Sequence, residues 1–130
     1  MTPVDQTTFG YRRFPFLPGN CLSACVASLL DIPTDAVPNF IEKDDRYEHT
    51  WLMRLNAWLA REGLCVWHYS ISDLSECADF CDYYIAWGNS VKYNLHAVVA
   101  NRNCIVHDPH PSRTGLRTVS GAIVITPCEF

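Results

Sequence analysis

The chain has 130 residues, of which 48% are hydrophobic and 18% are charged, and its net charge is −4 at pH 7. These values are ordinary for a single globular domain with one core. The acidic balance and the lack of any basic run argue against nucleic acid or an anionic membrane surface as the main partner. No apolar stretch approaches the ~18 residues that a membrane-spanning helix needs.

Seven cysteines stand at positions 21, 25, 65, 77, 81, 104 and 128. Their number is odd, and several lie inside apolar patterns, as buried free thiols do. The N-terminal stretch MTPVDQTTFGYRRF lacks the apolar segment of a signal peptide. These features predict free thiols in a reducing cytoplasm. The C-x3-C spacing of two pairs differs from the C-x2-C spacing typical of zinc sites, so we expect no metal and no other cofactor.

The first half of the chain predicts helices. Residues 1–18 are expected to be irregular, because prolines interrupt them. Asn20 is a residue type that caps helices, and apolar residues recur at helical spacing from Cys21 to Leu30. Pro33 begins a further short helical turn. A longer helix is expected from Glu48 to Glu62, where a glycine follows as a stop signal.

The second half changes to the alternating pattern that is typical of strands. The expected strands are Cys65–Ile71, Tyr83–Trp87, Leu95–Ala100, Cys104–Asp108 and Arg117–Ile125. The stretch Ser72–Asp82 is expected to be an irregular or short helical connection. Helices followed by strands predict one α+β domain with an antiparallel sheet, spanning residues 1–130.

The stretch PGNCLSACVASLL, residues 18–30, puts Cys21 at the start of the first predicted helix. A helix N-terminus carries partial positive charge and unpaired N–H groups, which favour a thiolate and could hold an oxyanion. Cysteine is also common as a small buried residue, so this position alone is a weak sign of catalysis. A nearby base would strengthen it.

Two predicted strands supply such a base. The strands LHAVVA and CIVHDP are separated by NRN, and a three-residue hairpin loop there would set His96 opposite Asp108. Opposite residues of an antiparallel pair have Cβ atoms about 4.5–5.5 Å apart, so the carboxylate would accept a hydrogen bond from the imidazole and orient it. A slip of one residue would place His107 there instead. Cys21, His96 and Asp108 thus form a candidate nucleophile, base and orienting residue.

These stretches resemble the papain-like cysteine peptidase superfamily, in particular its C39-type and NlpC/P60-type members and short phage and bacterial relatives. The resemblance is carried by GNCLSACVASLLDIPTDAVPNF, by YYIAWG, and by HAVV followed by VHDPHPS, and it covers residues 19–40 and 83–115. It implies a papain-like core, with an N-terminal cysteine-bearing helix packed on an antiparallel β-sheet. It also implies Cys21 as nucleophile, His96 as general base and then acid, and Asp108 as the orienting residue.

The oxyanion hole departs from the family pattern. Papain-like and C39-type enzymes usually place a glutamine about six residues before the cysteine, and here Pro15 occupies that position. The side-chain donor could instead be Asn20, next to the Cys21 backbone N–H, or Gln6, carried in by a folded-back N-terminal segment. Asn20 could equally serve only as a helix cap.

Trp87, Gly88 and His110 are the candidate substrate-binding residues. Trp87 and Gly88 end the strand before the predicted base, and His110 follows the predicted orienting residue. Each has a simpler interpretation, because a tryptophan at a strand end often belongs to the core and a loop histidine is often only solvated. A metal site is not expected here, since His107 and Asp108 point to opposite faces of the strand and His110 lies beyond a proline.

The expected function is a cytoplasmic cysteine hydrolase, namely a peptidase, isopeptidase or amidase, that forms a thioester acyl-enzyme. For a phage protein the compartment would be the host cytoplasm. The expected substrate is a peptide, a protein conjugate or a small amide. Two alternatives stay open: a transglutaminase-like acyltransferase with the same triad, and a non-enzymatic phage or bacterial binding protein on a papain-like scaffold.

Overall fold

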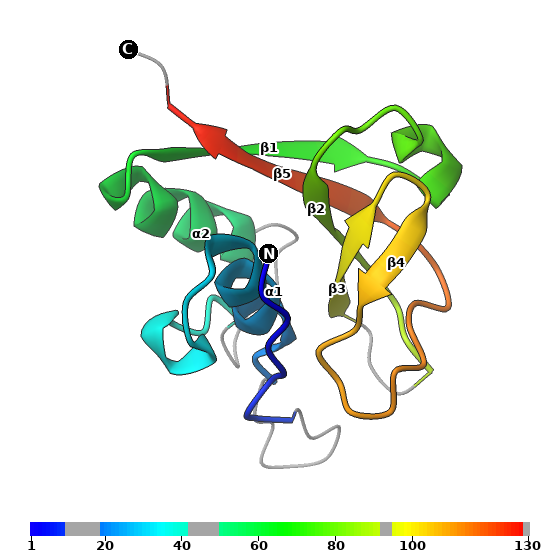
Figure 1. Cartoon of the computed structure of the whole chain (residues 1–130), viewed down its shortest axis with the longest axis horizontal. Coiled ribbons are helices and arrows are strands. Elements are labelled where there is room, and N and C mark those ends of the chain that lie inside the picture. Colours follow the sequence, from blue (N-terminus) through cyan, green and yellow to red (C-terminus); the bar gives the residue numbers. More distant parts are fainter. Residues whose placement is uncertain (10–18, 42–49, 92–94, 129–130) are drawn as a thin grey trace.

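The structure of the protein, a computed structural model, describes residues 1–9, 19–41, 50–91 and 95–128. Within these ranges the chain is an α+β fold, with two α-helices on one side of a five-stranded antiparallel sheet (Figure 1). The helices are α1 (Cys21–Leu30), α2 (Thr50–Arg61) and the short 3-10 helices η1 (Thr34–Ala36) and η2 (Leu74–Cys77). The strands are β1 (Leu64–Ser70), β2 (Tyr83–Gly88), β3 (His96–Asn101), β4 (Cys104–His107) and β5 (Gly121–Pro127). The predicted α+β class and the antiparallel sheet are confirmed.

Most predicted elements are present at nearly the predicted positions. Helix α1 has the predicted bounds, and α2 begins at Thr50, while its predicted start at Glu48 lies outside the described residues. The last strand differs most, because β5 begins at Gly121 and not at Arg117. The residues before β5 bond instead to the end of β2: Arg117 N donates to the Asn89 carbonyl at 2.6 Å, and Ser120 N donates to the Trp87 carbonyl at 2.9 Å.

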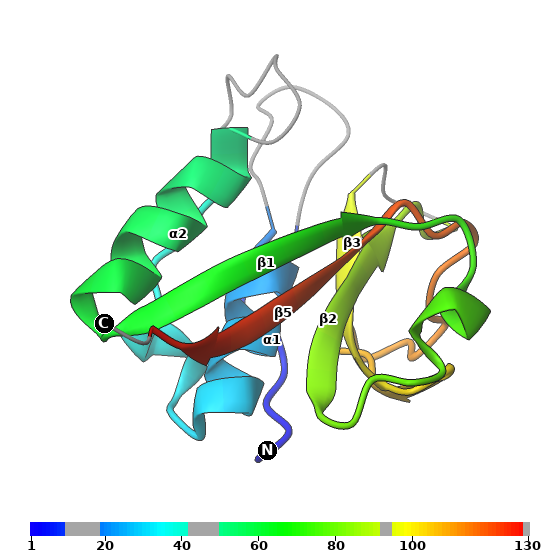
Figure 2. The same cartoon turned by 90° about the horizontal axis from the view of Figure 1, so that it is seen from above.

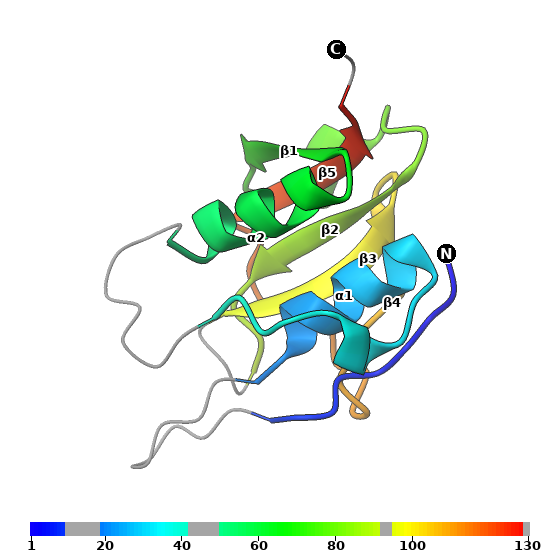
Figure 3. The ribbon, with the colours of Figure 1, turned by 90° about the vertical axis from the view of Figure 1, so that its left-hand side faces the viewer.

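The strand order is β1-β5-β2-β3-β4, so the C-terminal strand β5 lies between β1 and β2 (Figure 2). All neighbouring strands run antiparallel. Helix α1 packs mainly on β3, alongside which it lies in Figure 3, and α2 packs on β1. The predicted packing of the cysteine-bearing helix on the sheet is therefore present.

The two faces of the sheet bury separate apolar clusters. The face toward the helices packs Ile85, Val99 and Ile123 against α1 and α2. The other face packs Tyr84 and Val98 under the connection between β1 and β2. Because α1 is buried along most of its length, its first turn is held rigidly beside the sheet.

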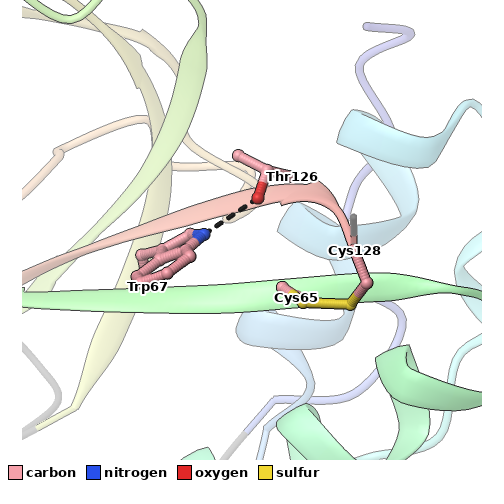
Figure 4. Close-up of a disulfide and its surroundings, with 4 residues drawn as sticks. All are labelled: Cys65, Trp67, Thr126 and Cys128. Atoms are coloured by element: carbon pink, nitrogen blue, oxygen red, sulfur yellow. Dashed lines mark hydrogen bonds between the residues drawn. A yellow bond between two sulfur atoms is a disulfide. The ribbon is translucent and has the colours of Figure 1, made fainter. Parts of the chain in front are cut away.

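Cys65 and Cys128 are joined by a disulfide that ties the end of β5 to the start of β1 (Figure 4). The Cys128 N–H also donates to the Gly63 carbonyl at 2.9 Å. The expectation of free thiols is therefore wrong for these two residues, because their 63-residue separation gives no local signal and only the β1–β5 pairing brings them together. The other five cysteines are free.

The disulfide also bears on the compartment. Such bonds persist in oxidising environments and are rare in the cytoplasm, so the disulfide does not favour the expected cytoplasmic location. Among the described residues, none of the helices has the length and apolar character needed to cross a membrane.

Candidate active site

Cys21 is the first residue of α1, and only 7% of it is exposed. The first hydrogen bond of the helix runs from Ala24 N to the Asn20 carbonyl, so the N–H groups of Cys21 and the next two residues have no acceptor within the helix. The side chain of Asn20 does not cap them. Unpaired donors and the positive end of the helix dipole thus lie beside the sulfur.

Asn20 serves as a clamp and not as a helix cap. Its Oδ1 accepts hydrogen bonds from the N–H groups of Thr7 and Thr8, both at 2.9 Å, and its Nδ2 donates to Thr7 Oγ1 at 2.8 Å. The predicted capping role is wrong, because the Asn20 backbone lacks the extended conformation of a capping residue and its side chain binds the N-terminal segment instead. Three hydrogen bonds thus turn the Asn20 amide toward the N-terminal segment, which disfavours Asn20 as the oxyanion donor.

The N-terminal strap, residues 1–9, runs between α1 and the loop that follows β4. On one side Val4 N donates to Ser28 Oγ at 3.0 Å, and on the other side Gln6 N donates to the Pro109 carbonyl at 3.1 Å. The Gln6 side chain is 6% exposed, and its Nε2 donates to the Thr8 carbonyl at 3.0 Å. The same carbonyl accepts the N–H of Asn20, so the Gln6 amide lies next to the residue before the candidate nucleophile.

The N-terminal segment therefore does fold back and brings the Gln6 side chain close to Asn20. Thr8 accepts one of the two Nε2 hydrogens, and no other residue that the structure describes accepts the second. Within the described part of the chain, the buried Gln6 Oε1 has no hydrogen-bond partner. A buried amide oxygen without a hydrogen-bond partner costs free energy of folding. Contacts of the N-terminal strap, and not hydrogen bonds of this oxygen, therefore hold Gln6 in place.

His96 and Asp108 form a buried pair. His96 Nε2 lies 2.7 Å from Asp108 Oδ1, and the two residues are 2% and 5% exposed. The carboxylate also accepts backbone hydrogen bonds, from His110 N to Oδ1 at 2.9 Å and from Gly115 N to Oδ2 at 2.7 Å. The predicted contact between the imidazole and the carboxylate is confirmed, and three donors fix the carboxylate.

The register that produces this contact differs from the predicted one. The hairpin pairs Asn101 with Cys104, so its loop has two residues and not three, and that register continued would set Asp108 opposite Ala97, on the wrong face. A β-bulge at Val106 adds one residue to β4 and shifts the register. One residue beyond the last pair, Asp108 then shares the side of His96 and lies diagonal to it, within reach of a side-chain hydrogen bond.

The electrostatics favour an ion pair at neutral pH. Burial lowers the pKa of His96, but hydrogen bonds to Asp108 and to the Cys21 thiol outweigh it and raise that pKa to about 9. Burial raises the pKa of Asp108, but hydrogen bonds from His96 and from two backbone N–H groups outweigh it, so that pKa lies below its ordinary value. The structure thus brings together all three predicted triad residues.

This pair makes stability depend on pH. The pKa of His96 rises from 6.5 to about 9 on folding, so its stabilising contribution is complete below about pH 6.5 and is lost as the pH rises through about 9. We expect this group to lower the free energy of unfolding by about 3 kcal/mol between about pH 6 and pH 10. Urea unfolding should show that the free energy of unfolding of Asp108→Asn no longer decreases over this pH range. Asp79→Asn, which changes an exposed carboxylate, should keep the decrease. An equal fall in the wild type and Asp108→Asn would contradict the assignment.

His110 lies beside the predicted base, His96. Its ring centroid is 6.4 Å from that of His96, in an edge-on arrangement. Phe9 of the N-terminal strap also packs edge-on against His110, with centroids 5.3 Å apart. These two rings border the site on the side of the loop after β4.

Trp87 and Gly88 have structural roles, and for Trp87 this is the simpler of the two interpretations that its sequence position allowed. Trp87 packs edge-on against Trp51 and stacks on His68, with centroids 5.4 and 5.7 Å away, and its Nε1 donates to His68 Nε2 at 3.2 Å. Gly88 pairs with His96 across β2 and β3 and is buried. A Cβ at Gly88 would lie 2.0 Å from the Thr118 carbonyl oxygen, so close chain packing explains this glycine without a substrate.

Comparison of the chain with family models, with curated proteins and with solved structures found no match. The geometry of the site is therefore the basis for its function. In the described ranges no group of three or more His, Cys, Asp or Glu side chains is arranged to hold a metal ion.

Arg113 could be assigned from the sequence to the loop after the predicted strand, but its pairing with Asp5 could not. Their side chains form an ion pair although they are 108 residues apart, and no motif or periodicity signals such a contact. His68 was likewise missed, since its contact with Trp87 depends on the order of the strands.

Proposed function

We propose that the protein is a cysteine hydrolase that cleaves an amide or peptide bond through a thioester on Cys21. The observation that carries this proposal is the buried His96–Asp108 pair, at 2.7 Å, whose imidazole hydrogen-bonds to the Cys21 thiol at the start of α1. A nucleophile, a base and a residue that orients the base are the parts that covalent catalysis by cysteine requires. The packing of α1 on the strand that begins at His96 supports a papain-like core as part of the proposal.

In the acylation step the Cys21 thiolate attacks the substrate carbonyl carbon, and the carbonyl electrons move to the oxygen. The backbone N–H of Cys21 and the second hydrogen of Gln6 Nε2 are the proposed donors to the oxyanion. Since Asp108 holds Nε2 of His96, the proton moves through Nδ1 to the leaving nitrogen. The C–N bond breaks, the amine leaves, and Cys21 carries the acyl group as a thioester.

In the deacylation step the now neutral His96 takes a proton from water, and the hydroxide attacks the thioester carbonyl. The C–S bond breaks, the carboxylic acid leaves, and the Cys21 thiolate and the His96 imidazolium are restored. Asp108 stays ionised throughout, because its carboxylate accepts hydrogen bonds from the imidazole and from two backbone groups.

Hydrolysis and transglutaminase-like acyl transfer differ only in the acceptor. If an amine attacks the thioester in place of water, the same residues perform acyl transfer, and product analysis with and without an added amine separates the two reactions. A peptide, a protein conjugate or a small amide is the proposed substrate. A binding protein without activity would leave the buried ion pair next to a thiol without a chemical purpose.

Limiting alkylation with iodoacetamide, followed by peptide mapping, tests the proposal. We expect Cys21 to react fastest of the five free cysteines, although it is buried. Cys81 and Cys104 are exposed, so accessibility alone would favour them. Cys25, fully buried one helical turn away, controls for position on α1. A Cys21 that reacts no faster than Cys81 and Cys104 would overturn the proposed function.

A further inference from the structure

Arg113 connects the two parts of the chain that carry candidate site residues. Its guanidinium binds both oxygens of Asp5, with Nη1 2.6 Å from Oδ1 and Nη2 2.9 Å from Oδ2. The same Nη1 donates to the backbone carbonyl of Asp108. Asp5 directly precedes Gln6 in the N-terminal strap, and Asp108 is the partner of His96. Arg113 thus contacts both the residue before the proposed oxyanion donor Gln6 and the residue that orients the base His96.

The loop after β4 is shaped to bring Arg113 to this position. Arg113 adopts a left-handed φ of 54°, a conformation that costs a non-glycine residue free energy, and its N–H donates to the His110 carbonyl at 3.0 Å. Gly115, with a φ of 74°, then turns the chain so that its N–H reaches Asp108 Oδ2. The turn therefore places both a backbone donor and a guanidinium on Asp108.

Asp5 is held from several sides. In addition to Arg113, His107 Nε2 of β4 lies 3.4 Å from Asp5 Oδ1, and Thr34 Oγ1 of η1 donates to the Asp5 carbonyl at 3.0 Å. The hydrogen bond from Arg113 is the main reason that the pKa of Asp5 lies below its ordinary value. The ionised carboxylate thus faces a guanidinium and a histidine, and it fixes the strap at the residue before Gln6.

Because the Arg113–Asp5 ion pair is partly exposed, its effect on stability is expected to be small compared with its effect on the position of the residues it joins. The side chains of Arg113 and Asp5 are 49% and 41% exposed, and ion pairs this exposed add little to stability. A bidentate guanidinium–carboxylate pair nevertheless fixes the relative orientation of the groups that it joins. Its effect should therefore be seen in the chemistry of the site and not in the melting temperature.

We propose that Arg113 is a positioning residue of the active site: through the Asp5 carboxylate and the Asp108 carbonyl, it keeps Gln6 and Asp108 in register with Cys21. This inference rests on the proposed function. It assigns to the N-terminal strap a part in catalysis that depends on an ion pair outside the triad. Because Asp5 also orients the guanidinium that donates to the Asp108 carbonyl, Asp5→Asn should reproduce the effect of Arg113→Gln, and the double variant should be no worse than either.

The test measures Cys21 alkylation by iodoacetamide across pH. We expect Arg113→Gln to slow it about tenfold and to move the pH profile to lower pH, since a less fixed Asp108 holds the His96 proton less tightly. Arg113→Lys should be nearly as slow, because lysine keeps the charge but not the bidentate fork. Arg61→Gln, at an exposed arginine that ends α2, is the matched control and should behave as the wild type.

The outcomes separate this inference from the proposed function. If Cys21 is activated and depends on His96, while Arg113→Gln and Asp5→Asn leave both the rate and the pH profile unchanged, the positioning role is overturned and the proposed function stands. If Arg113→Gln lowers the melting temperature so much that destabilisation explains the slower alkylation, the ion pair is structural and the inference is also overturned. If wild-type Cys21 is no more reactive than the exposed thiols, both proposals fail.

Discussion

His96→Ala should slow the alkylation of Cys21 at pH 7 by at least about a hundredfold. In the wild type the imidazolium lies beside the thiol, because its pKa is about 9, and it stabilises the thiolate that reacts with iodoacetamide. Without it, the Cys21 sulfur, which is only 7% exposed, has lost the base beside it. The measurement is the rate of carboxamidomethylation of the Cys21 peptide, followed by mass spectrometry.

Two controls accompany His96→Ala. Cys104 in the same molecule is exposed and remote from the site in the sheet, so its rate should stay constant. His68→Ala removes another histidine, one that contacts Trp87, and should leave the Cys21 rate within about threefold of the wild type. If the rates in His96→Ala and His68→Ala are equal, His96 does not activate Cys21.

Gln6→Met should slow acylation of Cys21 by a p-nitrophenyl ester about a hundredfold and leave alkylation by iodoacetamide unchanged. Attack on an ester forms an oxyanion, and removal of one oxyanion donor typically costs about 10²–10³-fold. Alkylation forms no oxyanion, so it reports only on the thiolate. Methionine matches the shape of glutamine and has no N–H donor. The release of p-nitrophenol in the first turnover gives the acylation rate.

The two rates together define the role of Gln6. Equal losses in acylation and alkylation would show that Gln6 supports the position of Cys21 and does not bind the oxyanion. An unchanged acylation rate would leave the backbone N–H of Cys21 as the donor and would remove Gln6 from the mechanism. Only a selective loss of acylation agrees with the proposal.

The local elements were largely predictable. Helix α1 begins at Cys21 and ends at Leu30, as its apolar periodicity indicates, and the strands from Tyr83 to His107 lie within a residue or so of the predicted positions. Periodicity and turn residues act over a few neighbouring positions, so they can be read without a structure. The predicted start of β5 was wrong because the chain from Arg117 to Ser120 forms hydrogen bonds with residues 87 and 89 at the end of β2, which is distant in the sequence.

The sequence by itself determined the elements and the residue types of the candidate site, because helix and strand periodicity is local. It also indicated that His96 and Asp108 would meet, although a two-residue loop and a bulge, and not the expected register, bring them together. Only the tertiary structure showed that the Asn20 side chain binds Thr7 and Thr8, which is why we propose Gln6 and not Asn20 as the oxyanion donor.

The tertiary structure likewise decided the Cys65–Cys128 disulfide and the Asp5–Arg113 ion pair. Both join residues that are far apart in the chain, and their approach depends on the order of the strands and on the path of the N-terminal strap. Such contacts leave no periodic trace in a sequence. They follow from the free energy of the whole fold, in which each polar group binds the partner that packing brings within reach.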